Sequence, residues 1–296
     1  MWTLIVSSLG FGVVLASIIA VAAMGFTVQL GLTNVLNLSY GAVMTVGAFV
    51  AYLAVSFKLN AWLAMVLGGL AGSLLTLVLG SGVFKMFARR GAHLFEMVMV
   101  TLGLSLIIEY AVQAISRDNI YQFVVLQSSS IVVGPIIISV TQLVLIGVAL
   151  AIFAALEVLL RLTKLGKALR AMAVDPSLAR SCGIRTGQIV TITWLLTGFL
   201  CGIAGVIYVI NSQSVDYYTG QLFLPLVIAA AILGGVGSPA GAFVAALIMG
   251  IVTQVVSALG GSAYSTVAGF GILVVVLLSR PSSVTGTSAG AAQLTL

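Results

Sequence analysis

The chain of 296 residues is 61% hydrophobic and 6% charged, with a mean hydropathy of +1.27. Soluble domains carry roughly 25% charged residues, so twelve bases and six acids could not cover a soluble fold of this length. The net charge of +6 lies in short segments between apolar runs, which is typical of cytoplasmic loops of a membrane protein and excludes a nucleic-acid-binding surface.

Nine apolar runs predict membrane-spanning helices, because about 20 apolar residues are needed to cross a bilayer core of about 30 Å. In chain order these runs are 4–28, 36–56, 60–84, 94–115, 135–159, 188–210, 222–236, 241–259 and 263–279. The expected fold is therefore an all-α integral membrane protein, a polytopic bundle of about 8–10 transmembrane helices. The run 222–236 is short, which also suits half of a discontinuous helix.

Basic residues predict the orientation of these spans. One cluster, Lys85 with Arg89 and Arg90, is followed two spans later by an island at 161–185 that holds six of the twelve bases. Because basic loops stay inside the cell, we expect the N-terminus outside and the C-terminus inside. Segment 116–134, with Arg117, Asp118 and the polar run Gln127 to Ser130, then lies outside. Residues 1–281 form the transmembrane domain, and 282–296 a disordered cytoplasmic tail.

The basic island, a cytoplasmic loop at 161–187, has a helical pattern of its own. Leu165, Leu169, Met172 and Ala173 recur at helical spacing; Asp175 can cap a second short helix that Pro176 begins, and Gly183 suits its C-terminal end. One interpretation is an amphipathic loop whose bases face lipid head groups. The other is a docking helix for a soluble partner, with contacts at Arg170, Ala171, Met172, Asp175, Pro176 and Gly183.

Two uncharged stretches, 31–41 and 234–241, interrupt the apolar pattern. Each leads into a similar run, Gly41-Ala42-Val43 and Gly241-Ala242-Phe243, and this weak echo hints at an internal duplication. Backbone that leaves the helix at membrane depth must be satisfied by protein or must line a cavity. Paired interruptions are typical of a transporter's substrate path.

Polar groups in these stretches are the substrate-path candidates: Asn34, Asn37, Tyr40, Gly41, Gly235 and Ser238. The alternatives are helix capping for the first stretch and a purely structural break for the second. Glu109 is added because acids within spans are costly and often functional; it can instead meet Arg117 or reach the outer boundary. Two further glycine pairs, Gly68-x-x-x-Gly72 and Gly198-x-x-x-Gly202, predict helix-packing faces.

Several kinds of chemistry are excluded. The phosphate-binding loop needs Gly-x-x-x-x-Gly-Lys-Ser/Thr, but Gly166-Lys167 has Arg161 at the first position and Ala168 at the last. The single His93 suits a solvated loop, and Cys182 and Cys201 have no metal-type spacing. We therefore expect no catalytic residues, no metal site and no cofactor bound by this chain.

The ordered motifs resemble those of permease subunits of branched-chain amino-acid ABC importers, the LivH/LivM group. The matching segments are Asn37-Leu38-Ser39-Tyr40-Gly41, Thr101-Leu102-Gly103-Leu104-Ser105, Gly166-Lys167-Ala168-Leu169-Arg170-Ala171 with Asp175 and Gly183-Ile184, Ala204-Gly205-Val206, Leu233-Gly234-Gly235-Val236-Gly237-Ser238 and Arg280-Pro281. They are collinear over nearly the whole chain. The resemblance implies a type II ABC importer-like fold in the bacterial inner membrane.

The resemblance also implies partners. One is a second permease subunit, favoured to be a paralogue, and another is an extracytoplasmic binding protein. Two cytoplasmic ATPase subunits would bind the coupling helix of the 161–187 loop and would carry the ATP and Mg. Membrane lipid is the remaining partner. Tyr40, Ala42 and Leu226 depart from the family pattern, so the expected cargo is a small polar solute, an amino acid or related compound. An ATPase-independent secondary transporter or channel is the alternative function.

Overall fold

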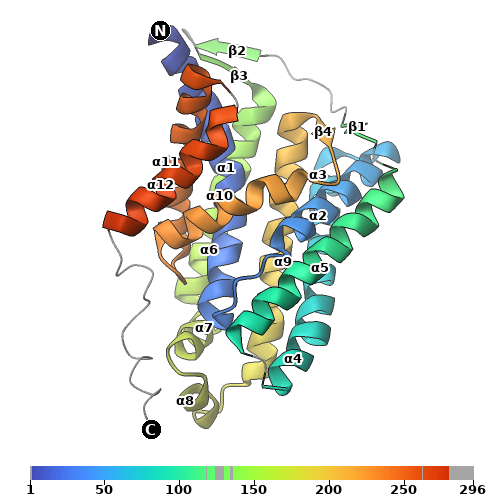
Figure 1. The fold of residues 1–296 in the computed structure, drawn as a ribbon, viewed down its shortest axis with the longest axis vertical. Helices are drawn as coiled ribbons and strands as arrows, with labels where there is room; N and C mark the ends of the chain where they lie inside the picture. Colours follow the sequence, from blue (N-terminus) through green and yellow to red (C-terminus); the bar gives the residue numbers. More distant parts are fainter. Residues whose placement is uncertain are drawn as a thin grey trace.

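The computed structural model describes residues 2–91, 93–117, 119–123, 130–133, 136–261 and 263–279. They form a helical bundle with short strands at one end (Figure 1). The helices are α1 (Trp2–Thr33), α2 (Tyr40–Ser56), α3 (Ala61–Val78), the π-helical turn η1 (Leu79–Phe84), α4 (Lys85–Arg89), α5 (Leu94–Ser116), α6 (Val140–Leu162), α7 (Lys164–Val174), α8 (Pro176–Ser181), α9 (Thr186–Ser212), α10 (Thr219–Gly234), α11 (Pro239–Gly260) and α12 (Ala263–Ser279).

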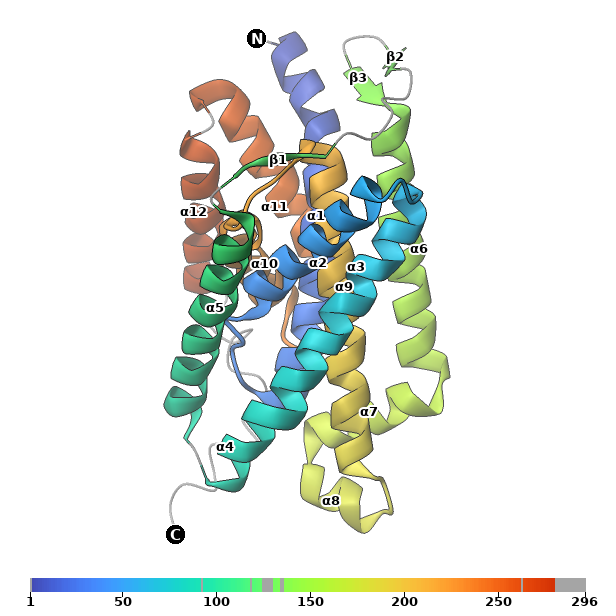
Figure 2. The ribbon, with the colours of Figure 1, turned by 90° about the vertical axis from the view of Figure 1, so that its right-hand side faces the viewer.

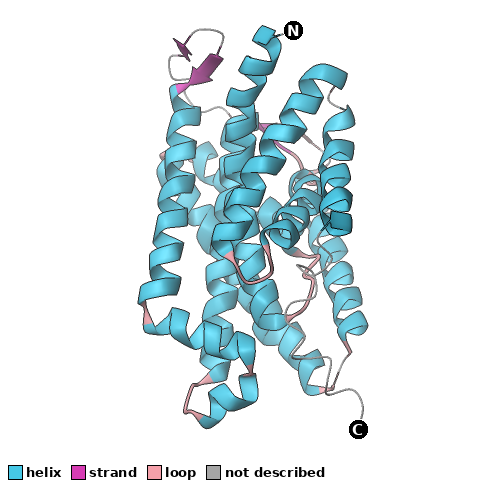
Figure 3. Cartoon of the chain, turned by 90° about the vertical axis from the view of Figure 1, so that its left-hand side faces the viewer, coloured by secondary structure: helices cyan, strands magenta, loops and turns pink. Residues whose placement is uncertain are grey.

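Two small antiparallel sheets complete the described elements. Strand β1 (Tyr121–Gln122) pairs with β4 (Ser214–Val215), and β2 (Ser130–Val133) pairs with β3 (Ile136–Ser139). They lie at the end of the bundle opposite α7 and α8 (Figure 3), and these two ends are called the strand end and the basic end below. Asp118 and most of the predicted polar run from Gln127, like the predicted tail 282–296, lie outside the described residues.

Each of the nine predicted apolar runs contains a helix: α1, α2, α3 with η1, α5, α6, α9, α10, α11 and α12. In the described part of the chain, six helices are long and apolar enough to cross a membrane, namely Ser8–Thr33, Ala61–Phe87, Leu94–Ser116, Val140–Leu162, Thr186–Ser212 and Pro239–Leu259. The shorter apolar helices α2 and α10 lie obliquely at mid-height within the bundle (Figure 2). These two short helices and α12, which is 17 residues long, account for the difference between nine apolar runs and six full-length spans.

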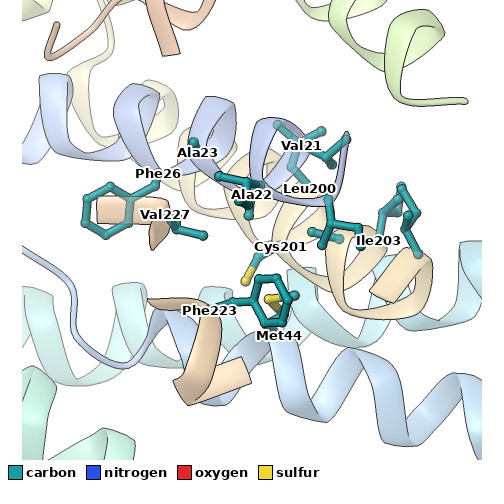
Figure 4. Packing of buried hydrophobic residues seen from close by; sticks show 14 of the residues in the cluster. Val21, Ala22, Ala23, Phe26, Met44, Leu200, Cys201, Ile203, Phe223 and Val227 are labelled. Atoms are coloured by element: carbon teal, nitrogen blue, oxygen red, sulfur yellow. The ribbon is translucent and has the colours of Figure 1, made fainter. Parts of the chain in front are cut away.

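The core of the bundle is built around α1 and α9. Helix α1 is hydrophobic all round, as expected of a helix enclosed on every side, and its residues from Ile18 to Met24 are fully buried. Figure 4 shows Ala22 and Phe26 of α1 beside Cys201 of α9, with Met44 of α2 and Phe223 of α10 closing the cluster. Helix α2 packs against α9, α10 packs against α1, and the two short helices also pack against each other.

Helices α3 and α9 approach each other through the predicted glycine faces. A Cβ atom on Gly72 would lie 2.3 Å from the Gly198 carbonyl oxygen, and one on Gly202 would lie 2.3 Å from the Gly68 carbonyl oxygen. Thr76 adds a hydrogen bond from its hydroxyl to the Trp194 carbonyl, 2.8 Å long. Both glycine pairs therefore act as packing faces, because only glycine allows the two backbones this close.

We predict that Gly202→Ala destabilises the protein by about 1–3 kcal/mol, because the new methyl group meets backbone that can only move by separating α3 from α9. The measurement is the thermal unfolding midpoint in detergent. Gly147→Ala in α6 is the matched control, because a Cβ there meets nothing within 4 Å, and it should leave the midpoint unchanged or raise it. Equal midpoints for the two variants would contradict the packing assignment.

Candidate functional site

The chain leaves the helical conformation between α1 and α2. Asn34 adopts a left-handed φ of 51° and its N–H still reaches the Leu30 carbonyl at 2.9 Å, which is an ordinary helix-ending role for asparagine. The following residues run without helical hydrogen bonds to Ser39. The side-chain oxygen of Asn37 then accepts hydrogen bonds from the N–H and the hydroxyl of Ser39, at 3.1 and 2.6 Å.

The backbone of this break takes further partners from α1, where the Thr33 hydroxyl accepts from the Val35 N–H at 3.4 Å, and from α5. The Leu38 N–H donates to the Thr101 hydroxyl oxygen at 3.1 Å, and the same hydroxyl lies 3.3 Å from the Leu36 carbonyl. Thr101 is fully buried. This side chain therefore stands in for a carbonyl acceptor that the Leu38 N–H would have had in a continuous helix.

The first turns of α2 and α10 meet at two glycines. A Cβ atom on Gly220 would lie 1.9 Å from the Gly41 carbonyl oxygen, and a Cβ atom on Gly41 would lie 3.0 Å from the Gly220 carbonyl oxygen. The Gly220 N–H donates to the Thr45 hydroxyl at 2.9 Å. The N-terminal ends of the two short helices therefore touch backbone to backbone. Gly241, which follows the second interruption as Gly41 follows the first, does not take part in this contact between α2 and α10. It packs against Gly234 instead.

A line of polar side chains on α5 faces this meeting point. Thr101, Ser105 and Glu109 recur every four residues, so they share one face of the helix, and all three are buried. The Gln221 amide nitrogen donates to the Ser105 hydroxyl at 2.9 Å, and Glu109 accepts a hydrogen bond from the Gln221 side chain. We call Asn37, Thr101, Ser105, Glu109 and Gln221 the polar seam.

The seam keeps unused hydrogen-bonding capacity. Within the described residues, the side-chain nitrogen of Asn37 and the side-chain oxygen of Gln221 are buried without a partner, as are both amide atoms of Gln29 on α1. A buried polar atom without a partner costs about 1–3 kcal/mol. The seam therefore suits a water molecule or a polar solute, to which it offers amide donors, hydroxyl groups and a carboxylate.

Glu109 lies inside the bundle. Its side chain is 6% exposed and is bonded to Gln221 across the seam. Sequence reasoning did not single out Ser105 or Gln221. The four-residue spacing of Thr101, Ser105 and Glu109 in an otherwise apolar helix was the signal that could have found the α5 part of the seam.

Tyr40 points to the opposite side of α2. Its hydroxyl donates to the Ala22 carbonyl at 2.9 Å, its ring packs edge-on against Phe26 with centroids 5.3 Å apart, and its carbonyl accepts a bond from the Cys201 thiol at 3.1 Å. Tyr40 is 1% exposed. These contacts give it the geometry of an anchor that holds α2 against α1 and α9.

The second interruption is a closed turn between α10 and α11. Gly235 and Gly237 adopt φ of 92° and 80°, which favour glycine. The Thr27 hydroxyl donates to the Gly235 carbonyl at 3.1 Å and accepts from the Gly237 N–H at 2.9 Å. Ser238 caps α11 by accepting from the Gly241 N–H at 3.2 Å. Gly235 and Ser238, like Asn34, therefore lie apart from the seam, near the C-terminal end of α1.

The basic island folds as two short helices, as its pattern predicts. Leu169 and Met172 of α7 are buried. Asp175 caps α8 by accepting bonds from the N–H groups of Ser177 and Leu178 at 2.8 and 3.1 Å. Hydrogen bonds from the Ser177 hydroxyl and from these two N–H groups lower the pKa of the Asp175 carboxyl group, which stays ionised at the cap. Gly183 follows α8 with a φ of 82°.

The tip of the two helices carries exposed apolar side chains. Val174 is 86% exposed and Leu178 is 62% exposed, on either side of the Asp175 cap, while Arg170, Ala171 and Pro176 are also exposed. A cavity of about 240 Å³ separates the inner side of α7 from the α10–α11 turn, between Arg170 and Gly237. The island therefore has an inner face toward the second interruption and an outer face that is open.

Among the residues that the structure describes, no group of three His, Cys, Asp or Glu side chains could hold a metal ion. His93 is exposed and precedes α5, and its N–H donates to the Glu96 carboxylate at 3.1 Å. Cys182 is exposed and Cys201 buried, and both are free thiols.

The helical bundle and its polar seam define a polytopic membrane permease. The chain belongs to the family described as the permease component of the branched-chain amino acid transport system, whose profile matches residues 8–278. It is therefore the permease subunit of an ABC importer, with an all-α, type II importer-like fold. The resemblance found in the sequence is confirmed, and the ATPase-independent alternative is set aside. ATP hydrolysis belongs to a separate subunit, and no cofactor is expected for a permease of this family.

Several curated relatives match over most of their length. The high-affinity branched-chain amino acid permease proteins BraD of Pseudomonas aeruginosa and LivH of Escherichia coli K12 are each 26% identical, over 93% of this chain and 94% and 93% of their own. The ribose import permease RbsC of Escherichia coli is 27% identical, over 84% of this chain and 77% of its own.

We predict that Tyr40→Phe lowers stability by about 0.5–1.5 kcal/mol, because the Ala22 carbonyl loses its bond from the phenol. Thermal unfolding in detergent measures this change. Transport by the variant should keep its dependence on solute concentration, because the phenol points away from the seam. A changed apparent KM with unchanged stability would instead make Tyr40 a solute contact.

Proposed function

We propose that the chain carries a small polar solute, an amino acid or related compound, along a path bordered by the polar seam. The observation that carries this proposal is the set of buried, unpartnered amide atoms of Asn37 and Gln221 in the seam that also holds the Glu109 carboxylate. A solute with an ammonium group and a carboxylate has groups that match the acceptors and donors of the seam. BraD and LivH carry names as branched-chain amino acid permeases, which supports this class of cargo.

Among the remaining candidates, Gly41 contributes by bringing the backbones of α2 and α10 together at the seam. Asn34, Gly235 and Ser238 are proposed to act at the basic end of the same path, where the α10–α11 turn packs on α1. Tyr40 is retained as a path residue only through its anchoring of α2. The named relatives include a ribose permease, and a sugar is therefore the second cargo class that a transport assay must include.

The basic end is proposed to be cytoplasmic, with the N-terminus outside and the C-terminus inside the bacterial inner membrane. Lys85 lines one cavity with Arg180 of the island and another with Arg90, so these bases gather at this end, as the positive-inside rule requires. The transmembrane domain is proposed to span residues 1–281, with 282–296 as a cytoplasmic tail.

The 161–187 loop is proposed to couple the permease to its ATPase. Apolar side chains as exposed as Val174 and Leu178, outside the membrane-spanning helices, are typical of a docking surface. The inner face of α7 approaches the α10–α11 turn, so a push on α7 is transmitted to the end of α1. Arg170, Ala171, Met172, Asp175, Pro176 and Gly183 form or support this docking unit.

Permeases of this kind work with ATPase and binding-protein partners. We propose that this chain assembles with a paralogous second permease, two cytoplasmic ATPase subunits and an extracytoplasmic binding protein that delivers the solute. Co-purification of these subunits with this chain is the direct check on the subunit composition of the importer.

We predict that the double variant Arg170→Glu/Ala171→Glu loses at least 90% of transport while its amount in the membrane is unchanged, because both residues are exposed on α7. Solute uptake and transport-linked ATP hydrolysis by the assembled importer are the measurements. Arg185→Glu/Gln188→Glu, also exposed at the basic end, is the control with the same change in charge and should retain transport. Wild-type uptake by the first variant would rule out docking through α7.

We predict that Glu109→Gln lowers the maximal uptake rate at least about tenfold when the binding protein is saturated, since a buried carboxylate in the path is replaced by a neutral group. Uptake of labelled amino acids and of ribose is measured in vesicles. Glu96→Gln is the matched control, an exposed acid on the same helix whose capping role glutamine preserves. Unchanged affinity and turnover for Glu109→Gln would exclude the path role.

A further inference from the structure

A cavity that none of the seam residues lines lies at the basic end. It has a volume of about 470 Å³ and lies between η1 with the start of α4, the coupling helices and the first turns of α9. We call it the basic cavity. A second hollow of about 410 Å³, lined by Lys85 and Arg90, adjoins it at Lys85.

The charges on the walls of the basic cavity are all positive. Lys85 contributes from the start of α4 and Arg180 from α8, and both are exposed. The linings of the cavity and of the adjoining hollow contain no Asp or Glu. The nearby Asp175 carboxylate is already occupied by the cap of α8. Two cations without a neighbouring acid form a site for an anionic group.

The remaining walls are mostly apolar, with hydroxyl groups at Thr33, Ser81, Thr186 and Thr191, and they run deep into the bundle. Trp194 stacks near Phe84, with ring centroids 4.7 Å apart, and packs directly on the backbone of Gly80 within the π-helical turn. Trp194 lies eight residues after the first residue of α9, which is about 12 Å along the helix. Leu77 and Val190 extend the same surface. An occupant therefore needs an anionic head group and an apolar tail of this length.

We propose that the basic cavity binds an anionic phospholipid of the leaflet at the basic end, with its phosphate between Lys85 and Arg180 and an acyl chain against Trp194. Basic pockets between transmembrane helices favour lipids of this kind. The apolar side chains Leu74 and Val78 on the adjoining outer face of α3 are exposed by 62% and 63%, as expected of a surface that faces lipid tails.

The lipid would contact both moving parts of the permease. Met172 and Pro176 of the coupling helices line the same cavity as Thr33 and Val35 at the end of α1. An acyl chain between them fills space that α7 and α8 would otherwise close on moving inward. The site thereby makes the coupling step depend on the lipid composition of the membrane.

The test is native mass spectrometry of the detergent-purified importer, titrated with phosphatidylglycerol or with phosphatidylcholine of identical acyl chains. We expect the wild type to bind phosphatidylglycerol at least about tenfold more tightly. The Lys85→Gln/Arg180→Gln variant should lose this preference. Lys164→Gln/Lys167→Gln removes the same charge from exposed positions of α7 outside the cavity and should keep it.

Gly187→Leu provides a second variant that leaves every charge in place. A Cβ atom on Gly187 would meet nothing within 4 Å, and Gly187 lines the cavity, so a leucine there should narrow the cavity and weaken binding of the lipid.

Three outcomes would overturn the proposal: equal binding of the two lipids by the wild type, equal losses in the test and control pairs, or unchanged binding by Gly187→Leu. Displacement of phosphatidylglycerol by millimolar glycerol 3-phosphate, which has no acyl chain, would assign the site to a soluble anion and would also overturn it.

Discussion

The hydroxyl of Thr101 accepts a hydrogen bond from the Leu38 N–H and lies 3.3 Å from the Leu36 carbonyl, at the break where α1 has stopped. Leu36 and Leu38 lie in a bundle whose surroundings exclude water, and an unsatisfied backbone group there would be too costly to keep. With Thr101 in place, the chain can turn back into the bundle and begin α2 at Tyr40. The position of α2, its contact with α10 at Gly41 and Gly220, and the polar seam beside them all follow from this bridge.

The second break is satisfied by the same means, a threonine hydroxyl from another helix. Thr27 closes the turn at Gly235 and Gly237 from the side of α1, so both breaks are tied to rigid helices by single side chains. The inner face of α7 approaches this turn across a cavity. The basic end is therefore connected to the interior of the bundle through the turn and its hydrogen bonds to Thr27. Such contacts can be exchanged without repacking a large core.

Much of this arrangement could be predicted from the sequence, because it depends on local patterns. Asp175 and Pro176 mark the start of α8 by chemistry that acts within three residues, and Gly183 marks its end. The apolar runs show the helices since the bilayer fixes their composition. The resemblance to the LivH/LivM group, carried by collinear motifs, gave the family and the importer fold correctly.

The partners of the candidate site residues could not be predicted. Gln221 and Ser105 are separated by 116 residues, and no local period relates them. Tyr40 looked suited to contact a solute because it is polar within an apolar run, yet its hydroxyl is used by a carbonyl of α1. The echo between the two breaks pointed to Gly241, while the backbone that meets Gly41 is at Gly220. Pairings of this kind depend on how helices cross, which a single sequence does not specify.

The Thr101 bridge also has a consequence for biosynthesis. Leu38 is synthesised 63 residues before Thr101, the side chain that accepts the hydrogen bond from its N–H. The N–H of Gly220 donates to Thr45, which was synthesised 175 residues earlier. The break after α1 is therefore incomplete when it first reaches the membrane and must wait near water or the translocon until α5 has been inserted. The order of translation then sets the order of assembly, with α1 and α5 placed before α2 can settle, α10 joining it afterwards, and α11 packing on α1 later still.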